Sequence, residues 1–450
     1  MNSPLFYVST SAFNLLGAEA WLGGLQFIST VDAFDGQHPR IFVPEDAQAQ
    51  AFDSFEAATH YLLTHPAVGE RVRQAGPGGR ALFLMFDERT EELARQLGLT
   101  VGFPPAQLRH RLGSKVHTTQ LGEQAGVPSV PHVLARVQSY EGLRQVAGVL
   151  GPELVVQLPF GNSGKTTWFI SSEEDFLRHA ALIAAEPVVK IMRRIRCRQA
   201  TIEACVTRQG TLVGPLMTEL VGFPELTSRR GGWCGNEVFP VSASSVLSAQ
   251  LRRQALQATR ALGERLRREG YWGYFGLDFL IDEDTGALYL GELNPRITGA
   301  TLLTSLVARR RGEVPLLHFH LLEGLGEAPA LDVEGFNASW VEPEGFTGFS
   351  QLILEHTAST SAVVSQTVPS GIWRMEPDGS VHFVRREFQP EALAGEDEAF
   401  FFRTVHKGET LSEGTVLGRL VVRGRLMTDG YQLNSRAQAW IRGLRARFTP

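Results

Sequence analysis

The stretch that decides the fold runs from residue 276 to residue 296. It reads GLDFLID over 276–282 and LYLGELN over 288–294, and Pro295 and Arg296 follow directly. The apolar residues of these runs predict two strands, over Tyr274–Asp282 and Ala287–Asn294. Residues 283–286 read EDTG, which is typical of a turn. We therefore expect two neighbouring strands joined by a short connection.

Polar side chains on this strand pair predict a cation site. Because side chains alternate between the two faces of a strand, Glu292 and Asn294 should share one face. Asp278 joins them only if it lies opposite Glu292, which requires a five-residue connection (283–287) or a β-bulge. Two carboxylates and an amide oxygen suit Mg²⁺, and Arg296 can hold a phosphoryl or carboxylate oxygen. The alternative is an ordinary amphipathic hairpin with a polar outer face.

A glycine-bearing segment, GNSGKT over 161–166, ends like a phosphate-binding P-loop. Pro159 stands where the first glycine of that motif belongs, and the flanking residues predict strands on both sides. A P-loop instead leads into a helix whose N-terminus faces the phosphates. We therefore predict a hairpin loop whose backbone N–H groups and Lys165 can cover phosphates. A plain surface turn is the alternative.

Four of the 43 basic residues are lysines, at positions 115, 165, 190 and 407. The others are arginines, so most cationic surface positions in this chain carry a guanidinium. A lysine that is kept in such a chain is a candidate for a place that needs a compact point charge.

Shorter patterns predict further elements around these motifs. Strands are expected at 81–85, 154–160, 166–170 and 187–192, and helices at 91–97, 114–123, 171–185, 245–269 and 435–447. Ser114 should cap the second of these helices, and Ser171 with Glu174 should form a capping box for the third. The part after Gly326 is expected to be rich in strands.

Composition narrows the class of protein. The chain has 450 residues, of which 43% are hydrophobic and 20% charged, with a formal charge of −5, as in a globular protein of several domains. The sequence has no basic domain of the kind that indicates a nucleic-acid-binding surface. The three cysteines have no metal-site spacing, no signal peptide is evident, and no apolar run is long enough to span a membrane. We expect a cytoplasmic protein that binds neither nucleic acid nor membranes.

These residues together resemble the ATP-grasp superfamily. That family has an acidic residue on one strand and the pattern E-x-N-x-R on the next, here Asp278 and the ELNPR of 292–296. Lys115 followed by the AGVP of 125–128 is similar to the family's central region, and residues 155–170 are similar to its small lid. The resemblance covers about 108–306.

The whole chain is similar to the biotin carboxylase-like branch and, in detail, to peptide ligases of the pheganomycin type. The similar segments are GGWCGN at 231–236 and LGRL at 417–420. The resemblance implies an α/β fold with an α+β lid. The implied parts are a pre-ATP-grasp α/β domain (1–112), an ATP-grasp domain (113–324, with the lid at about 131–188) and a β-rich C-terminal domain (325–450).

The resemblance also implies the site residues. It assigns catalytic roles to Lys115 and Arg296. It assigns the binding of Mg²⁺ to Asp278, Glu292 and Asn294. ATP would contact Lys115, Gln157, Gly161, Asn162, Ser163, Gly164, Lys165, Lys190, Ile191 and Met192. Most family members carry a lysine where this chain has Gln157, so either Lys165 replaces that charge or ATP is held differently. Arg229, Arg230 and Trp233 are candidates for a substrate carboxylate, against the alternative of an exposed basic turn.

The implied activity is an ATP- and Mg²⁺-dependent ligase that joins a small-molecule carboxylate to an amine, on an amino acid or peptide, through an acyl phosphate. The alternatives are a biotin carboxylase-like carboxylase and a non-catalytic ATP-binding protein. A homodimer is compatible with this family.

Overall fold

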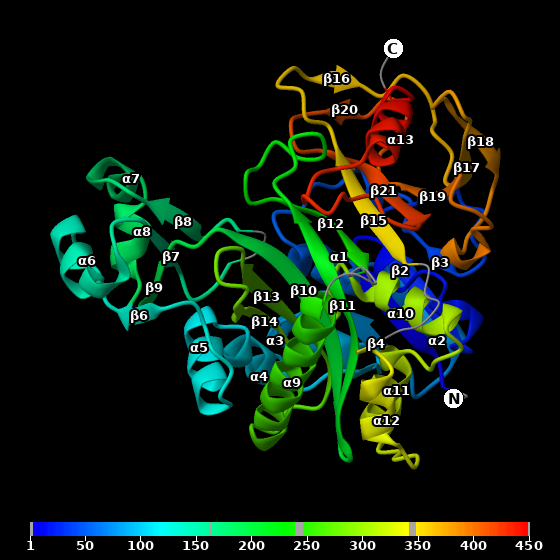
Figure 1. The fold of residues 1–450 in the computed structure, drawn as a ribbon. Coiled ribbons are helices and arrows are strands. Elements are labelled where there is room, and N and C mark those ends of the chain that lie inside the picture. The colour runs from blue at the N-terminus through cyan, green and yellow to red at the C-terminus, as the bar shows by residue number, and fades with distance from the viewer. Residues whose placement is uncertain (1–2, 162–163, 239–245, 342–347, 449–450) are drawn as a thin grey trace.

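The computed structural model describes residues 3–161, 164–238, 246–341 and 348–448, and its ribbon is shown in Figure 1. It contains three main sheets, of five, four and ten strands, and a two-stranded sheet made of β16 (Ala362–Val363) and β20 (Thr410–Leu411). Single turns of 3-10 helix lie at Phe13–Leu15, Ala18–Ala20, Ala47–Ala49, Gly148–Leu150 and Pro390–Ala392. The mixed α/β class expected from the sequence is confirmed.

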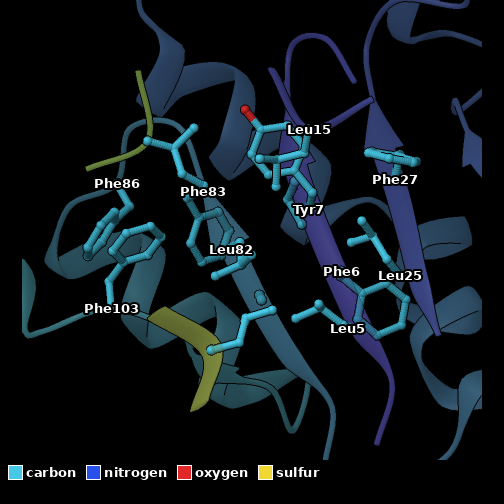
Figure 2. Packing of buried hydrophobic residues seen from close by; sticks show 14 of the residues in the cluster. Leu5, Phe6, Tyr7, Leu15, Leu25, Phe27, Leu82, Phe83, Phe86 and Phe103 are labelled. Carbon is cyan, nitrogen blue, oxygen red and sulfur yellow. The ribbon is translucent and has the colours of Figure 1, made fainter. Parts of the chain in front are cut away.

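The N-terminal part is a parallel five-stranded sheet of order β3-β2-β1-β4-β5. Its strands are β1 (Leu5–Ser9), β2 (Leu25–Ser29), β3 (Ile41–Phe42), β4 (Arg80–Phe83) and β5 (Thr100–Val101). Its helices are α1 (Phe55–Thr64), α2 (Pro66–Ala75), α3 (Glu88–Gln96) and α4 (Ala106–Leu112). Figure 2 shows its core, in which Phe6, Phe27 and Phe83 are fully buried on three adjacent strands.

The lid is an antiparallel sheet of order β6-β9-β7-β8 that projects to the left in Figure 1. Its strands are β6 (His132–Ala135), β7 (Leu154–Gln157), β8 (Thr167–Ile170) and β9 (Val189–Arg193). Its helices are α6 (Tyr140–Val146), α7 (Glu173–Leu177) and α8 (Ala180–Ala185), and α5 (Lys115–Gln124) precedes it. As predicted, the Ser114 side chain caps α5 and residues 161–165 connect two strands.

The predicted capping box and helix of the lid were wrong in detail. Ser172 and Asp175, rather than Ser171 and Glu174, exchange the capping hydrogen bonds. The single helix expected to reach Ala185 is divided into α7 and α8. The reason is a one-residue shift, because Ser171 still belongs to the extended segment that leaves β8.

The largest sheet has the order β14-β13-β10-β11-β12-β15-β21-β19-β17-β18. Its strands are β10 (Cys197–Thr207), β11 (Gly210–Val221), β12 (Trp233–Val238), β13 (Gly273–Asp282), β14 (Leu288–Asn294), β15 (Phe349–Glu355), β17 (Gly371–Met375), β18 (Val381–Arg385), β19 (Glu398–Arg403) and β21 (Val416–Arg423). The remaining helices are α9 (Val246–Arg268), α10 (Thr301–Arg310), α11 (Leu316–Leu325), α12 (Val333–Ala338) and α13 (Ser435–Arg445).

This sheet is continuous across the domain boundary predicted at residues 324 and 325, because β12 pairs with β15. The long helix α9 packs on one face of its central strands. The other face carries polar residues, among them Thr201, Asp278 and Glu292. Among the described residues, no helix is long and apolar enough to cross a membrane.

Candidate active site

The strands β13 and β14 place Asp278 directly opposite Glu292. The connection between them is a four-residue turn, because the Asp282 N–H donates to the Ala287 carbonyl. A regular ladder from that turn would pair Asp278 with Gly291. A bulge at this position shifts the register by one residue, so the carboxylates share a face. Glycine suits the bulge, since a Cβ on Gly291 would lie 3.0 Å from the Asp278 carbonyl oxygen.

A chain of hydrogen bonds links these residues to Arg296. Thr201 Oγ1 donates to Asp278 Oδ1 and Asn294 Nδ2 donates to Asp278 Oδ2, both at 2.9 Å. Arg296 in turn donates to Asn294 Oδ1 at 2.9 Å. The Asn294 amide therefore bridges the carboxylate and the guanidinium, with its oxygen toward Arg296.

The pKa of Asp278 is raised to about 7, first by burial and then by repulsion from Glu292. A third carboxylate, Glu219 on β11, is buried nearby, and its pKa is raised by burial and by Asp278 and Glu292. This concentration of negative charge would be relieved by a bound cation.

The donor set fits Mg²⁺ that is shared with phosphate oxygens. In the described part of the chain, no group of three or more His, Cys, Asp and Glu side chains is arranged to hold a metal. Mg²⁺ usually takes one or two protein carboxylates and completes its shell with water and substrate phosphates. The pair Asp278 and Glu292 matches that requirement.

Two of the four lysines, Lys115 and Lys190, lie beside this carboxylate pair. Lys115 Nζ is 3.3 Å from Glu292 Oε1 and donates to the Gly161 carbonyl at 2.9 Å. Lys190 is buried on β9, and its pKa is lowered to about 8 by burial and by repulsion from Lys115. Positive charge from two elements thus faces the metal candidates.

Lys190 pairs across the lid sheet with Gln157. Gln157 Nε2 donates to Thr167, and its Oε1 is buried without a partner in the described part of the chain. Lys165, by contrast, is exposed at the hairpin tip. Lys190 is therefore the lysine that the fold places next to Gln157.

The structure describes some of the remaining lid candidates and not others. Ile191 and Met192 are buried beside Lys190 on β9, and Gly164 adopts a φ of +72° in the hairpin. The predicted contacts of Asn162 and Ser163 lie outside the described residues.

The candidates for substrate binding are not brought together. Arg229 forms an ion pair with Glu355 at 2.8 Å, and the Arg230 guanidinium lies over the ring of Phe169 on the lid. Trp233 instead packs against Gly299, since a Cβ there would lie 2.1 Å from the indole ring. The tryptophan thus contacts the loop that follows Arg296.

Glu203 is a site residue that sequence reasoning missed. Its fully buried carboxylate accepts hydrogen bonds from Thr298 at 2.6 Å, Thr301 at 2.7 Å, Tyr274 at 2.6 Å and Thr304. These bonds tie the loop after Arg296 to β10 and β13. A signal was present, because Thr201 and Glu203 are alternate polar residues in an otherwise apolar segment.

Known proteins resemble this chain in sequence and in fold. No family model matches the sequence. The chain is 23% identical over 267 residues to biotin carboxylase 1 of Bacillus subtilis, which covers 57% of this chain and 55% of that protein. It is 22% identical over 241 residues to the [butirosin acyl-carrier protein]–L-glutamate ligase of Niallia circulans, which covers 51% and 54%. The chain therefore spans about half the length of these relatives.

A solved structure matches this chain over nearly its whole length. The biotin carboxylase domain of 2-oxoglutarate carboxylase from Hydrogenobacter thermophilus superposes with a TM-score of 0.60 at 14% identity. The match covers 93% of this chain and 86% of that one. The chain therefore has the fold of the ATP-grasp superfamily, with a biotin carboxylase domain among its structural neighbours.

Proposed function

We propose that this chain is an ATP-dependent carboxylate–amine ligase that forms an amide bond through an acyl phosphate. The observation that supports this best is the hydrogen-bonded series Asp278–Asn294–Arg296, with Glu292 and Lys115 beside it. It combines a cation-binding carboxylate pair with fixed positive charge. Those are the requirements of phosphoryl transfer, in which a protein mainly positions the reactants and neutralises charge.

ATP is assigned to the space between the lid and β13–β14. Lys115 and Lys190 would face its phosphates, and the 161–165 hairpin would cover them and exclude water, because acyl phosphates hydrolyse. Asp278 and Glu292, with Asn294 beside them, would hold Mg²⁺, which would supply positive charge to neutralise the phosphates. Ile191 and Met192 are the candidates for contact with the adenine.

Arg296 is assigned to the reacting carboxylate. It would stabilise the acyl phosphate and then the oxyanion that forms when the amine attacks. A single donor of this kind is worth about 10²–10³ in rate. The hydrogen bond from Arg296 to Asn294 supports this role, because it holds the guanidinium beside the metal candidates.

A carboxylase is the second candidate. The names of the Bacillus subtilis relative and of the structural neighbour favour it, whereas the Niallia circulans relative is named as a ligase of L-glutamate. A non-catalytic ATP-binding protein is the third candidate, because the lid lysine is replaced by Gln157. The buried charge of Lys190 across the strand from Gln157 weighs against it.

The test is ADP release from Mg-ATP, with amino acids and dipeptides supplied singly and in pairs, and with bicarbonate supplied alone. We expect at least one carboxylate–amine pair to stimulate release, and mass spectrometry to find the corresponding amide. Release that depends on bicarbonate and needs no amine would establish the carboxylase instead. A chain that releases no ADP under any of these conditions contradicts both enzymes.

A further inference from the structure

Arg419, on β21, is a half-buried cation, and no counter-charge pairs with it among the described residues. Its guanidinium donates to Asn14 Oδ1 at 3.1 Å and lies 4.8 Å from the centre of the Phe13 ring. Its Nε has no hydrogen-bond partner, and no Asp or Glu among the described residues forms an ion pair with it. Burial lowers its pKa to about 10. The neighbouring Arg403, on β19, forms an ion pair with Asp35 at 2.6 Å, and Arg419 differs from it in lacking such a pair among the described residues.

Asn14 connects Arg419 to the loop that follows Arg296, and Tyr7 adds a buried hydroxyl on β1. The Tyr7 side chain is fully buried, and in the described part of the chain its hydroxyl makes no close hydrogen bond, although the Ser9 side chain lies near enough to lower its pKa. Burial raises the pKa of Tyr7 to about 12, and Ser9 together with the charges of Arg419 and Arg296 opposes that rise. Asn14 Nδ2 donates to the carbonyl of Thr298, two residues beyond Arg296.

Arg419 lies on the face of the ten-stranded sheet that also carries the metal candidates. Its register places Glu292, Asp278 and Thr201 in one row across β14, β13 and β10. A second row consists of Glu219, Asn236 and Gln351 on β11, β12 and β15. Arg419 lies two residues from the β21 partner of Gln351, and alternation therefore brings it to this face.

This polar face carries charges of both signs. Asp278 and Glu292 lie on β13 and β14, and Arg296 is hydrogen-bonded to Asn294 beside them. Arg419 lies apart from this group on β21, and no Asp or Glu among the described residues forms an ion pair with it. The first group suits a cation with phosphates, and Arg419 suits an anion. Arginine is the residue that binds a carboxylate with two parallel hydrogen bonds.

We propose that Arg419, with the Tyr7 hydroxyl and Asn14, binds a substrate carboxylate that the reaction does not consume. The ligand class is therefore an amino acid or a peptide with a free carboxylate, held by that group while its amine points toward Arg296. This assignment rests on the proposed ligase function and replaces Arg229 and Arg230, whose guanidinium groups already contact Glu355 and Phe169.

The first test measures binding without turnover. Unfolding midpoints are recorded with Mg-ADP and each of the common L-amino acids, and again with the corresponding amino-acid amides at the same ionic strength. We expect at least one acid, and not its amide, to raise the midpoint of the wild-type chain. The Arg419→Met variant should lose that rise and Arg419→Lys should keep part of it. Arg423→Met, a change on the same strand, should behave as wild type.

Three results would overturn the assignment. They are no rise with any acid, an equal rise with acid and amide, and a rise that persists in Arg419→Met. The unfolding midpoint of the ligand-free Arg419→Met variant separates a binding role from a purely structural role of this arginine. Removing a charge that lacks a counter-charge should leave the midpoint of Arg419→Met unchanged or raised, whereas loss of a structural contact should lower it.

A second variant covers the case in which Arg419→Met does not fold. Tyr7→Phe removes only one hydroxyl, and we expect it to weaken binding of the acid about tenfold, since a hydrogen bond to a charged group is worth that much. Unchanged affinity for the acid in Tyr7→Phe would contradict the role of the hydroxyl and, with a non-folding Arg419→Met, the proposed subsite.

ADP release then separates this proposal from the proposed function. If an acid binds through Arg419 but no combination of substrates releases ADP, the ligase function fails and the subsite stands. If ADP is released and the KM for the acid is the same in Arg419→Met as in wild type, the subsite fails and the function stands. We expect instead a KM at least tenfold higher, with the KM for ATP unchanged.

Discussion

At the scale of single residues, Glu292 carries the most direct test of the site. Its carboxylate lies opposite Asp278 and contacts Lys115. We expect Glu292→Gln to lower the rate of ADP release by about 10²-fold or more, because one fixed charge at a phosphoryl-transfer site has an effect of that order. The side chain is partly exposed, so the unfolding midpoint should change little.

The matched control for this change is Glu283→Gln. That carboxylate lies on the turn of the same hairpin and pairs with Arg198 at the surface. We expect it to keep wild-type turnover. Equal activity in the Glu292→Gln and Glu283→Gln variants would remove Glu292 from the metal site.

Lys190 predicts a pH dependence of nucleotide binding. Its pKa in the folded protein is about 8, below that of an ordinary lysine, so it loses its charge as the pH rises through 8. Phosphates favour the charged form, and we therefore expect ADP affinity to fall above pH 8, by at most about tenfold per pH unit. Calorimetry at several pH values measures this. Lys190→Met should abolish the dependence and Lys407→Met, an exposed control, should retain it.

The contribution of Lys190 to the stability of the fold changes with pH in the opposite direction to its effect on ADP affinity. The unfolded chain, with an ordinary lysine pKa of about 10.4, binds more protons than the folded chain between pH 8 and that value. The contribution of Lys190 to the free energy of unfolding therefore rises with pH across this window. A fall in that contribution, relative to Lys190→Met, would show that Lys190 is not the buried cation described.

At the scale of elements, the lid helix α7 depends on its cap. Ser172 Oγ accepts the Asp175 N–H at 3.2 Å, and the Asp175 carboxylate accepts the Ser172 N–H at 3.1 Å. We expect Ser172→Ala to destabilise the helix by about 1 kcal/mol. Hydrogen exchange of the α7 amides measures this locally. Ser171→Ala is the control, and an equal loss of protection in both variants would mean that the cap is not specific.

At the scale of the whole molecule, ligand binding should stabilise the chain as a unit, because one sheet joins the metal candidates to the C-terminal strands. We expect Mg-ADP to raise the free energy of unfolding by about 2.7 kcal/mol at a concentration one hundred times its Kd. The magnesium-dependent part of that rise should vanish in Asp278→Asn. Denaturant titrations of the ADP-bound chain with Mg²⁺ and with a chelator separate the magnesium-dependent part of the rise from the rest. An equal rise with Mg²⁺ and with the chelator would contradict the metal site.

The sequence by itself determined the local elements of this protein. Hydrophobic periodicity and turn residues placed the strands β13 and β14, the helix α9 and the Ser114 cap close to their observed bounds. These depend on residues that are near in the chain. The charged motif at Glu292, Asn294 and Arg296 was visible for the same reason.

Only the tertiary structure decided what these elements bring together. The bulge at Gly291 determined that Asp278 faces Glu292, which the spacing alone left open. Strand pairing put Lys190, rather than Lys165, beside Gln157. Packing of the N-terminal domain on β21 brought Asn14 to Arg419, 405 residues away. The physical reason is that register and packing are set by contacts between distant segments, which no local pattern encodes.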